Sequence, residues 1–245
     1  MIIQSHQTLI STPTGNMQTS VYRPLENGTY PTIIFYSEIF QETAPITRSA
    51  KLMAGHGFVV LVPEVFHELN PVGTVLAYDD AGKDKGNADK FSKPLEQHDG
   101  DTQSMIRFID EQIYCSGRVG TMGVCIGGHL AFRAALNSRI EGAFCLYPTD
   151  IHSNTLPCEL GNDSLSQCHI INAELCMIFG KQDPHVSREG RELINTTMQN
   201  HNLLYSWHEL NAQHAFMRDE GDRYDPAIAL SCYQMAIQLF NRRLS

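Results

Sequence analysis

The sequence predicts an α/β fold with a mostly parallel central sheet and helices on both faces. Short apolar runs rich in β-branched residues alternate with segments whose apolar residues recur at helical spacing, an order typical of repeated strand and helix units. The 245 residues and the 42% hydrophobic content allow a large core. We therefore expect one domain over residues 1–245, with ligands bound beyond the carboxyl ends of the strands.

The N-terminal part of the chain is expected to form an antiparallel hairpin followed by two buried strands. Turn-forming Pro, Gly and Asn residues at 12–16 join the strands of the hairpin. The two later strands are continuous apolar runs, which are typical of strands buried on both faces of a parallel sheet. The expected elements are strands at 8–11, 17–22, 32–36 and 58–62 and a helix at 43–55.

Between residues 64 and 96 the hydrophobic periodicity disappears, and Gly and Asp residues dominate. A loop of this length inside a compact domain is usually functional or mobile. We expect a lid-like excursion that contains one short helical turn. Helical periodicity returns at 99–113, where Thr102, Ile106 and Ile109 share a face.

The C-terminal half continues the alternation of strands and helices. Asp225 followed by Pro226 is a helix start, because Asp caps the first turn and Pro suits the first helical position. Ser187 is a candidate cap for the preceding helix. The expected strands are at 118–124, 142–147, 175–180 and 203–208, and the expected helices at 130–136, 187–199 and from 225 onward.

The segment 118–136 carries the most informative motif of the chain. Its apolar run breaks into Gly-x-Cys-x-Gly-Gly and continues into helix-forming residues, which predicts a strand, a sharp turn and a helix. Gly123 and Gly127 would let strand and helix pass closely. Cys125 would then project from the apex, beside the free amides of a helix N-terminus. The alternative is a buried core cysteine next to a glycine turn.

Two phosphate-binding motifs do not fit this segment. A dinucleotide fingerprint fails because Met122 or Cys125 stands where its second glycine is required. A P-loop fails because His129 and Leu130 stand where Lys and Ser or Thr must bind phosphate and Mg²⁺.

Composition excludes several classes of partner. The formal charge of −9 argues against a nucleic-acid or anionic-membrane surface. Residues 1–10 lack the pattern of a signal peptide, and no apolar stretch reaches the roughly 20 residues that span a bilayer. We expect a cytoplasmic protein, either a monomer or a small homo-oligomer, that acts on a small molecule.

The seven cysteines contain no C-x-x-C pair, so zinc-ribbon and redox-motif interpretations lack support. The pair His67–Glu68 lacks the second histidine that a zincin helix requires. We therefore expect no metal and no cofactor.

A nucleophilic Cys125 needs a base and an acid to orient that base. Cys125, Asp183 and His214 each follow a predicted strand, in the order nucleophile, acid, histidine that α/β-hydrolases use. Because parallel strands end at one edge, these three side chains should converge. Asp150 is an alternative acid, and the alternative bases are His185, which shares a loop with Asp183, and His208, which lies within a strand.

Four segments in this order resemble the dienelactone hydrolases (carboxymethylenebutenolidases), a cysteine-using branch of the α/β-hydrolases. They are Glu38–Phe40, Gly123–Phe132, Gly180–Asp183 and His214–Arg218. The resemblance runs from about Ile33 to the C-terminal helix, and it implies an α/β-hydrolase fold and a hydrolase of lactone or ester bonds.

The resemblance also implies roles for individual residues. Cys125, Asp183 and His214 would be the triad, and the backbone N–H groups of Ile39 and Ile126 would form the oxyanion hole. Glu38 would be a buried carboxylate that contacts the thiol and helps to control when the thiolate forms. A simple carboxylate at a strand edge is the alternative for Glu38.

The sequence departs from the family pattern around the substrate. Gln41 stands where the family has glycine. The family also has an arginine that binds the substrate carboxylate, but in this chain no arginine lies between Arg48 and Arg107. Arg218 matches the second carboxylate-binding arginine. Candidate replacements for the missing arginine are Lys83, Lys85, Lys90 and Lys93, and the aromatic residues expected to line the pocket are Phe40, Tyr78, Tyr147 and Phe216.

We therefore expect a cysteine-dependent hydrolase of lactones or esters that works through an acyl-enzyme. A promiscuous carboxylesterase or thioesterase is the first alternative. The second is a non-catalytic protein that uses Cys125 as an oxidisable thiol.

Overall fold

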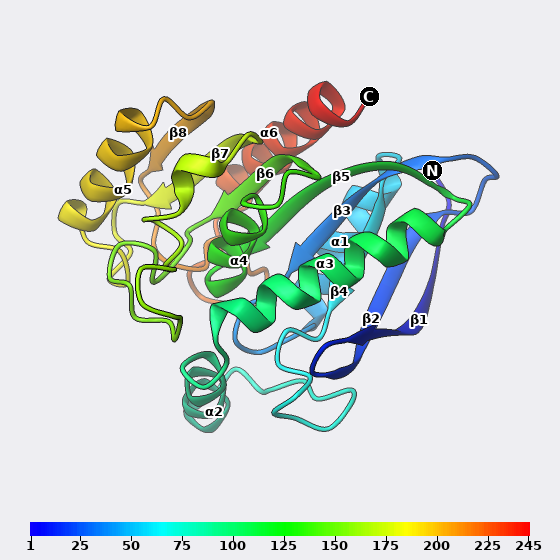
Figure 1. The fold of residues 1–245 in the computed structure, drawn as a ribbon, viewed down its shortest axis with the longest axis horizontal. Coiled ribbons are helices and arrows are strands. Elements are labelled where there is room, and N and C mark those ends of the chain that lie inside the picture. The colour runs from blue at the N-terminus through cyan, green and yellow to red at the C-terminus, as the bar shows by residue number, and fades with distance from the viewer.

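A computed structural model describes all residues from Met1 to Ser245, and the chain forms one eight-stranded sheet (Figure 1). The strands are β1 (Ile3–Thr12), β2 (Gly15–Pro24), β3 (Tyr30–Tyr36), β4 (Val59–Pro63), β5 (Cys115–Val124), β6 (Ile140–Leu146), β7 (Glu174–Gly180) and β8 (Tyr205–Leu210).

The order of the strands across the sheet is β1-β2-β4-β3-β5-β6-β7-β8. β1 pairs antiparallel with β2, and β2 pairs antiparallel with β4, whereas all other pairs are parallel. The mostly parallel sheet and the opening antiparallel hairpin are thus confirmed. The hairpin strands are longer than expected. The prediction was too short because the edge strand β1 is largely exposed, so its start carries little hydrophobic pattern.

Helices cover both faces of the sheet. α1 (Ala44–Gly55) and α6 (Pro226–Leu244) pack on one face, whereas α3 (Leu95–Glu111), α4 (Ile126–Ala134) and α5 (Arg188–Asn200) pack on the other, with α3 and α4 in front in Figure 1. Two separate apolar clusters of 37 and 27 buried residues fill the two interfaces. A 3₁₀ turn, Cys168–Ile170, precedes β7.

The excursion at 64–96 holds a longer helix than expected. Instead of one short turn, α2 (Asp80–Lys90) has 11 residues, and α3 begins at Leu95 rather than near 99. Asp79 caps α2 by accepting a hydrogen bond from the Gly82 amide (2.8 Å). A Cβ at Gly86 would lie 2.7 Å from the Ile39 carbonyl oxygen. Gly86 therefore serves close packing against the loop after β3, and Gly82 serves close packing against Ala77.

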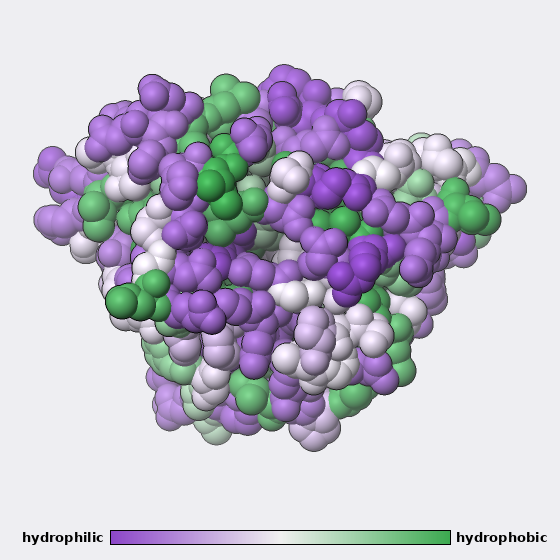
Figure 2. Space-filling model, in the orientation of Figure 1, coloured by the Kyte–Doolittle hydropathy of each residue, from purple (hydrophilic) through white to green (hydrophobic).

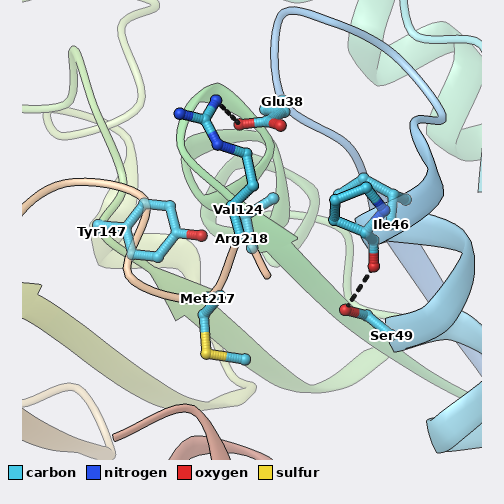
Figure 3. Close-up of a pocket in the computed structure, with 8 residues that line it drawn as sticks. Glu38, Ile46, Ser49, Val124, Tyr147, Met217 and Arg218 are labelled. Atoms are coloured by element: carbon cyan, nitrogen blue, oxygen red, sulfur yellow. Dashed lines mark hydrogen bonds and ion pairs between the residues drawn. The ribbon is translucent and has the colours of Figure 1, made fainter. Parts of the chain in front are cut away.

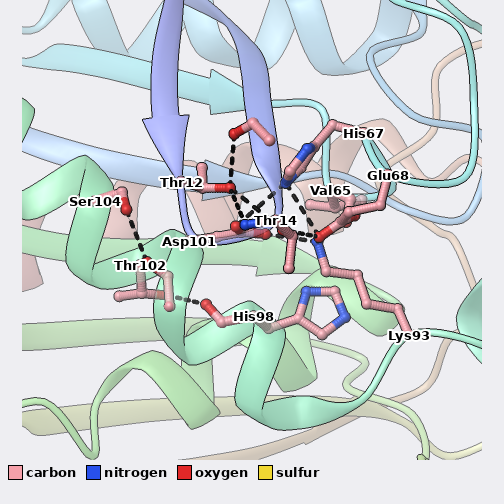
Figure 4. Close-up of polar contacts among 12 residues, drawn as sticks. Thr12, Thr14, Val65, His67, Glu68, Lys93, His98, Asp101, Thr102 and Ser104 are labelled. Atoms are coloured by element: carbon pink, nitrogen blue, oxygen red, sulfur yellow. Dashed lines mark hydrogen bonds and ion pairs between the residues drawn. The ribbon is translucent and has the colours of Figure 1, made fainter.

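A buried ion cluster fastens the excursion to α3 (Figure 4). The Lys93 ammonium donates to the Val65 carbonyl oxygen (2.9 Å), to Glu68 Oε2 (2.8 Å) and to Asp101 Oδ2 (2.5 Å). His67 Nε2 lies 3.2 Å from Asp101 Oδ1. All three ammonium protons of a fully buried lysine thus have acceptors, which fixes both ends of the excursion.

The face of the molecule seen in Figure 2 is mainly hydrophilic, and its hydrophobic residues form separate small patches. None of the helices combines the length and the hydropathy of a membrane-spanning segment.

Candidate active site

Cys125 lies at the apex of a sharp turn between β5 and α4. Its backbone has φ 59° and ψ −125°, a left-handed conformation that is costly for a residue with a Cβ. The Cys125 amide donates to the Leu146 carbonyl oxygen (3.1 Å), which holds the turn on the neighbouring strand β6. The predicted strand, turn and helix are confirmed.

The two flanking glycines permit this turn. A Cβ on Gly123 would lie 1.9 Å from the Gly127 carbonyl oxygen, and a Cβ on Gly127 would lie 2.2 Å from the Tyr36 carbonyl oxygen. Neither distance is possible for a real side chain. The elbow therefore requires glycine on both sides of Cys125.

Asp183 and His214 meet at the same edge of the sheet. Asp183 follows β7 and His214 lies in the loop after β8, and both side chains are buried. Asp183 Oδ2 is 2.6 Å from His214 Nδ1. Asp150, the alternative acid, instead accepts from Lys90 Nζ at 3.1 Å and from the Thr155 hydroxyl at 2.8 Å. Asp183 is thus the carboxylate that orients the imidazole.

His214 and Cys125 both line the cavity above the elbow, close enough for the sulfur to act on the imidazole. Burial lowers the pKa of His214, but the charge of the Cys125 sulfur and the bond to Asp183 outweigh burial and raise this pKa to about 10. An imidazole held in this way can take the proton of a neighbouring thiol. The structure therefore brings the three residues of the expected triad together.

Glu38 follows β3 and is buried beside Tyr78 and Arg218. The Tyr78 hydroxyl donates to Glu38 Oε1 (2.7 Å), and Arg218 Nη1 lies 3.9 Å from Glu38 Oε2, as Figure 3 shows for the arginine. Burial raises the pKa of Glu38, while Tyr78 and Arg218 act in the opposite direction. The carboxylate makes no hydrogen bond to Cys125, and its expected contact with the thiol stays a prediction.

Two backbone amides have the positions expected for an oxyanion hole. Ile126 is the first residue of α4, where N–H groups lack partners within the helix. Ile39 lies in the loop after β3, and its N–H group donates to no other backbone group. Ile39 lines the cavity above Cys125 and Ile126 directly follows Cys125 in the chain, and their catalytic role stays a prediction.

A cavity of about 750 Å³ opens above Cys125 and His214. Its lining comes from the loop after β3, from α2 and from the loops that follow β5, β6, β7 and β8. The lining residues are Glu38, Ile39, Phe40, Tyr78, Asp79, Asp80, Lys83, Asn87, Lys90, Cys125, Thr149, Pro184, His185, His214, Ala215, Arg218 and Arg223.

The four predicted aromatic residues divide into two pairs. Phe40 and Tyr78 line the cavity and pack edge-on at 4.8 Å between ring centroids. Tyr147 and Phe216 are absent from its lining and are fully buried. Tyr147 packs edge-on against His214 at 5.0 Å and against Phe216 at 4.9 Å. Tyr147 supports the imidazole, and Phe216 supports Tyr147. Phe216 lies outside the pocket, contrary to expectation, whereas Tyr147 lines only a small neighbouring pocket beside Glu38 and Arg218.

The four candidate lysines also divide into two pairs. Lys83 and Lys90 line the cavity. Lys85 pairs with Asp89, and Lys93 is fixed in the buried cluster described above, so neither of these two reaches the site.

Sequence reasoning missed Arg223 as a site residue and offered His185 only as an alternative base. Both line the cavity. The His185 ring packs against the ring of His214 with centroids 4.5 Å apart. Their positions in the sequence could have indicated this, since His185 follows β7 in the loop of Asp183 and Arg223 follows β8 in the loop of His214. Such loops meet at one edge of the sheet.

The sheet, the strained elbow and the ordered cysteine, acid and histidine define an α/β-hydrolase. The sequence model of the Dienelactone hydrolase family matches residues 17–244. A Saccharomyces cerevisiae protein named "Putative carboxymethylenebutenolidase" is 42% identical over 223 residues, which cover 88% of this chain and 81% of the yeast protein. The chain therefore belongs to the dienelactone hydrolase family and is a hydrolase of lactone or ester bonds.

More distant relatives agree with this assignment. A carboxymethylenebutenolidase from Pseudomonas putida is 24% identical over 195 residues, which cover 79% of this chain and 78% of the bacterial protein. The crystal structure of a Klebsiella pneumoniae protein, titled "Putative Dienelactone Hydrolase", superposes with a TM-score of 0.86 at 19% identity and covers 99% of this chain and 100% of its own. The latter comparison confirms the fold.

Proposed function

We propose that Cys125, His214 and Asp183 hydrolyse a lactone or ester through an acyl-enzyme. The observation that carries this proposal is the position of His214, which bonds Asp183 through Nδ1 at 2.6 Å and lines the same cavity as Cys125. This arrangement gives the thiol a base and gives the base a fixed orientation.

In the first half-reaction, the Cys125 thiolate attacks the substrate carbonyl carbon and a C–S bond forms. The amides of Ile39 and Ile126 would bind the oxyanion of the tetrahedral intermediate, and the loss of one such donor typically costs about 10²–10³ in rate. As the C–O bond breaks, the protonated His214 gives its proton to the leaving oxygen. In a lactone this oxygen stays attached to the acyl group.

In the second half-reaction, neutral His214 takes a proton from water, and the hydroxide attacks the thioester carbonyl. The C–S bond breaks, the carboxylic acid product leaves, and the thiolate and imidazolium are restored. Asp183 keeps the imidazole in the tautomer that presents a free nitrogen to the sulfur and to the water.

Arg218 supports a substrate that bears a free carboxylate. Its guanidinium lines the cavity and stacks 4.3 Å from the centroid of the Tyr78 ring, which holds its planar fork in place. Relatives of this chain are named carboxymethylenebutenolidases. An enol lactone with an acid group is therefore the substrate class we propose.

The test is the turnover of a dienelactone and of p-nitrophenyl acetate by wild type and by Cys125→Ala. We expect the variant to lose both activities by at least about 10³-fold, because no other thiol lines the cavity. Cys158→Ala is the matched control, since Cys158 lies in a loop outside the cavity. Unchanged turnover by Cys125→Ala would defeat the proposal.

The size of the cavity favours a second candidate, a carboxylesterase with broad acyl specificity. About 750 Å³ is large enough for ligands well beyond the size of a small lactone. A panel of neutral p-nitrophenyl esters of increasing acyl length distinguishes the two candidates. Rates that rise with acyl length and exceed the rate on the dienelactone would favour the esterase.

A further inference from the structure

Two groups of His, Asp and Glu side chains have the spacing of a metal site. In each group the potential ligand atoms all lie within 4.8 Å of one another. The first group is His67, Glu68 and Asp101. The chain itself supplies a cation there, because the Lys93 ammonium lies 2.8 Å from Glu68 and 2.5 Å from Asp101. This first group therefore needs no metal ion.

The second group is Asp183, His185 and His214, at the edge of the sheet where the parallel strands end. No Lys or Arg forms an ion pair with it, since Asp183 pairs with His214 alone. Asp183 and His214 are buried, whereas His185 is exposed in the wall of the cavity. This group therefore offers one carboxylate and two imidazoles to an ion that enters through the cavity.

We propose that Asp183, His185 and His214 form an inhibitory site for a divalent transition-metal ion of the zinc class. Imidazole nitrogen and carboxylate oxygen are ligands of Zn²⁺, and three protein ligands with a water in the fourth position make an open tetrahedral site. Mg²⁺ and Ca²⁺ prefer oxygen ligands, so a set that includes two imidazoles selects against them.

The geometry requires little rearrangement around the ion. Asp183 Oδ2 and His214 Nδ1 are 2.6 Å apart. Two ligands of a tetrahedral zinc ion lie about 3.3 Å apart at the usual bond lengths, so these two atoms would have to separate by about 0.7 Å. The third ligand is already beside them, because the rings of His185 and His214 are 4.5 Å apart between centroids. The His185 amide also holds the other oxygen of Asp183 (2.8 Å), as partners outside the ligand set do in metal sites.

An ion at this place removes the base of the proposed reaction. It takes the position of the proton between His214 Nδ1 and Asp183, and this proton passes to the solvent. A neutral imidazole that binds metal through Nδ1 carries its remaining proton on Nε2, so it has no free nitrogen to accept a proton from Cys125 or from water. The ion is thus an inhibitor and not a cofactor. This loss of activity rests on the proposed hydrolase function, whereas the binding of the ion does not.

The experiment titrates Zn²⁺ into metal-free protein in competition with a chromophoric chelator and follows the hydrolysis of p-nitrophenyl acetate in parallel. We expect wild type with bound Zn²⁺ to keep less than about a tenth of its activity, because a general base typically contributes 10²–10⁴-fold, and EDTA should restore the rate. Mg²⁺ at the same concentration should not inhibit.

Three variants locate the ion. His185→Gln should need at least about tenfold more Zn²⁺ for half-saturation, since even partners outside the ligand set typically contribute about 10–100-fold. Cys125→Ala should bind Zn²⁺ at least as tightly as wild type, because the sulfur is not a ligand. His201→Gln is the matched control, since His201 is an exposed histidine at the end of α5, outside the cavity, and its replacement should leave the inhibition by Zn²⁺ unchanged.

Equal Zn²⁺ affinity of His185→Gln and wild type would overturn the inference, as would the absence of binding to wild type. Affinity that is lost in Cys125→Ala but kept in His185→Gln would also overturn it, since the ion would then lie on the sulfur. The same holds if wild type with bound Zn²⁺ stays fully active. Failure of the hydrolase function looks different, because metal-free wild type would then not hydrolyse the ester, and the binding titrations would still test the site.

Discussion

Replacement of Lys93 by Met should destabilise the protein strongly, although Lys93 lies outside the cavity. The lysine side chain is fully buried and has three acceptors at 2.5 to 2.9 Å, two of them the carboxylates of Glu68 and Asp101. Removing the ammonium leaves two carboxylates without the lysine charge, although Glu68 keeps the Thr14 hydroxyl and Asp101 keeps His67. Breaking a buried ion pair from one side typically costs about 3–5 kcal/mol.

For a chain of this length, 1 kcal/mol corresponds to a shift of about 2–4 °C in Tm. Lys93→Met should therefore lower Tm by about 6–20 °C, measured by circular dichroism at pH 7. The double variant Lys93→Met with Asp101→Asn should lose less than the sum of the two single variants, because it removes one of the uncompensated charges.

Lys51→Met is the control for this experiment. Lys51 is exposed on α1 and forms no ion pair, so its replacement should change stability by no more than about 0.5 kcal/mol. If Lys93→Met melts within 2 °C of wild type, the cluster does not hold the excursion in place and the reasoning is wrong.

Three further predictions concern the elbow and the triad. Gly127→Ala should lower the free energy of unfolding by more than about 4 kcal/mol in urea titrations, because its Cβ would lie 2.2 Å from the Tyr36 carbonyl oxygen. The control Gly55→Ala has open space around its Cβ and should not lower the free energy of unfolding. Asp183→Asn should lower kcat on p-nitrophenyl acetate by about 10²–10⁴-fold while the fold stays intact, and a loss below tenfold would argue against its orienting role. The pKa of His214 is raised to about 10, so the folded state keeps a proton that the unfolded state releases above pH 6.5. The protonated imidazole therefore stabilises the fold fully below pH 6.5, and this stabilisation is lost as pH rises through about 10. Urea unfolding of wild type and His214→Gln across this range should show the difference shrinking with pH, and a constant difference would contradict the assignment.

The elbow and the meeting of Asp183 with His214 could be predicted from the sequence. Gly123 and Gly127 are required by the turn itself, and a chain reversal that demands glycine at two fixed places leaves a visible motif. Asp183 and His214 follow strands of a parallel sheet, whose ends meet at one edge. Their convergence is a consequence of topology.

The excursion could not be predicted in the same way. Helix α2 buries only Gly82, Gly86 and Asp89, so it has no apolar stripe, and its glycines read as loop residues. The helix needs these glycines because it approaches other parts of the chain closely, and no local sequence pattern records such an approach. The same holds for Tyr147 and Phe216, since only the packing shows that Tyr147 lies against His214 and that Phe216 lies against Tyr147, with neither ring in the large cavity.

The contacts of Glu38 could not be predicted from the sequence either. Its partner Tyr78 comes from the excursion, 40 residues away, and the 2.7 Å bond between them depends on how that segment folds back over the sheet. A carboxylate after a strand predicts a functional group at the edge, but not which neighbour it bonds.

The most direct test of the central claim is to capture the acyl-enzyme. Wild-type protein mixed with p-nitrophenyl acetate is quenched in acid within the first turnovers, and the peptides are mapped by mass spectrometry. We predict one acetyl group on the peptide that carries Cys125, formed as fast as the first p-nitrophenolate is released and absent from Cys125→Ala. An acyl group on another residue, or turnover by Cys125→Ala without any acylated peptide, would contradict a cysteine nucleophile.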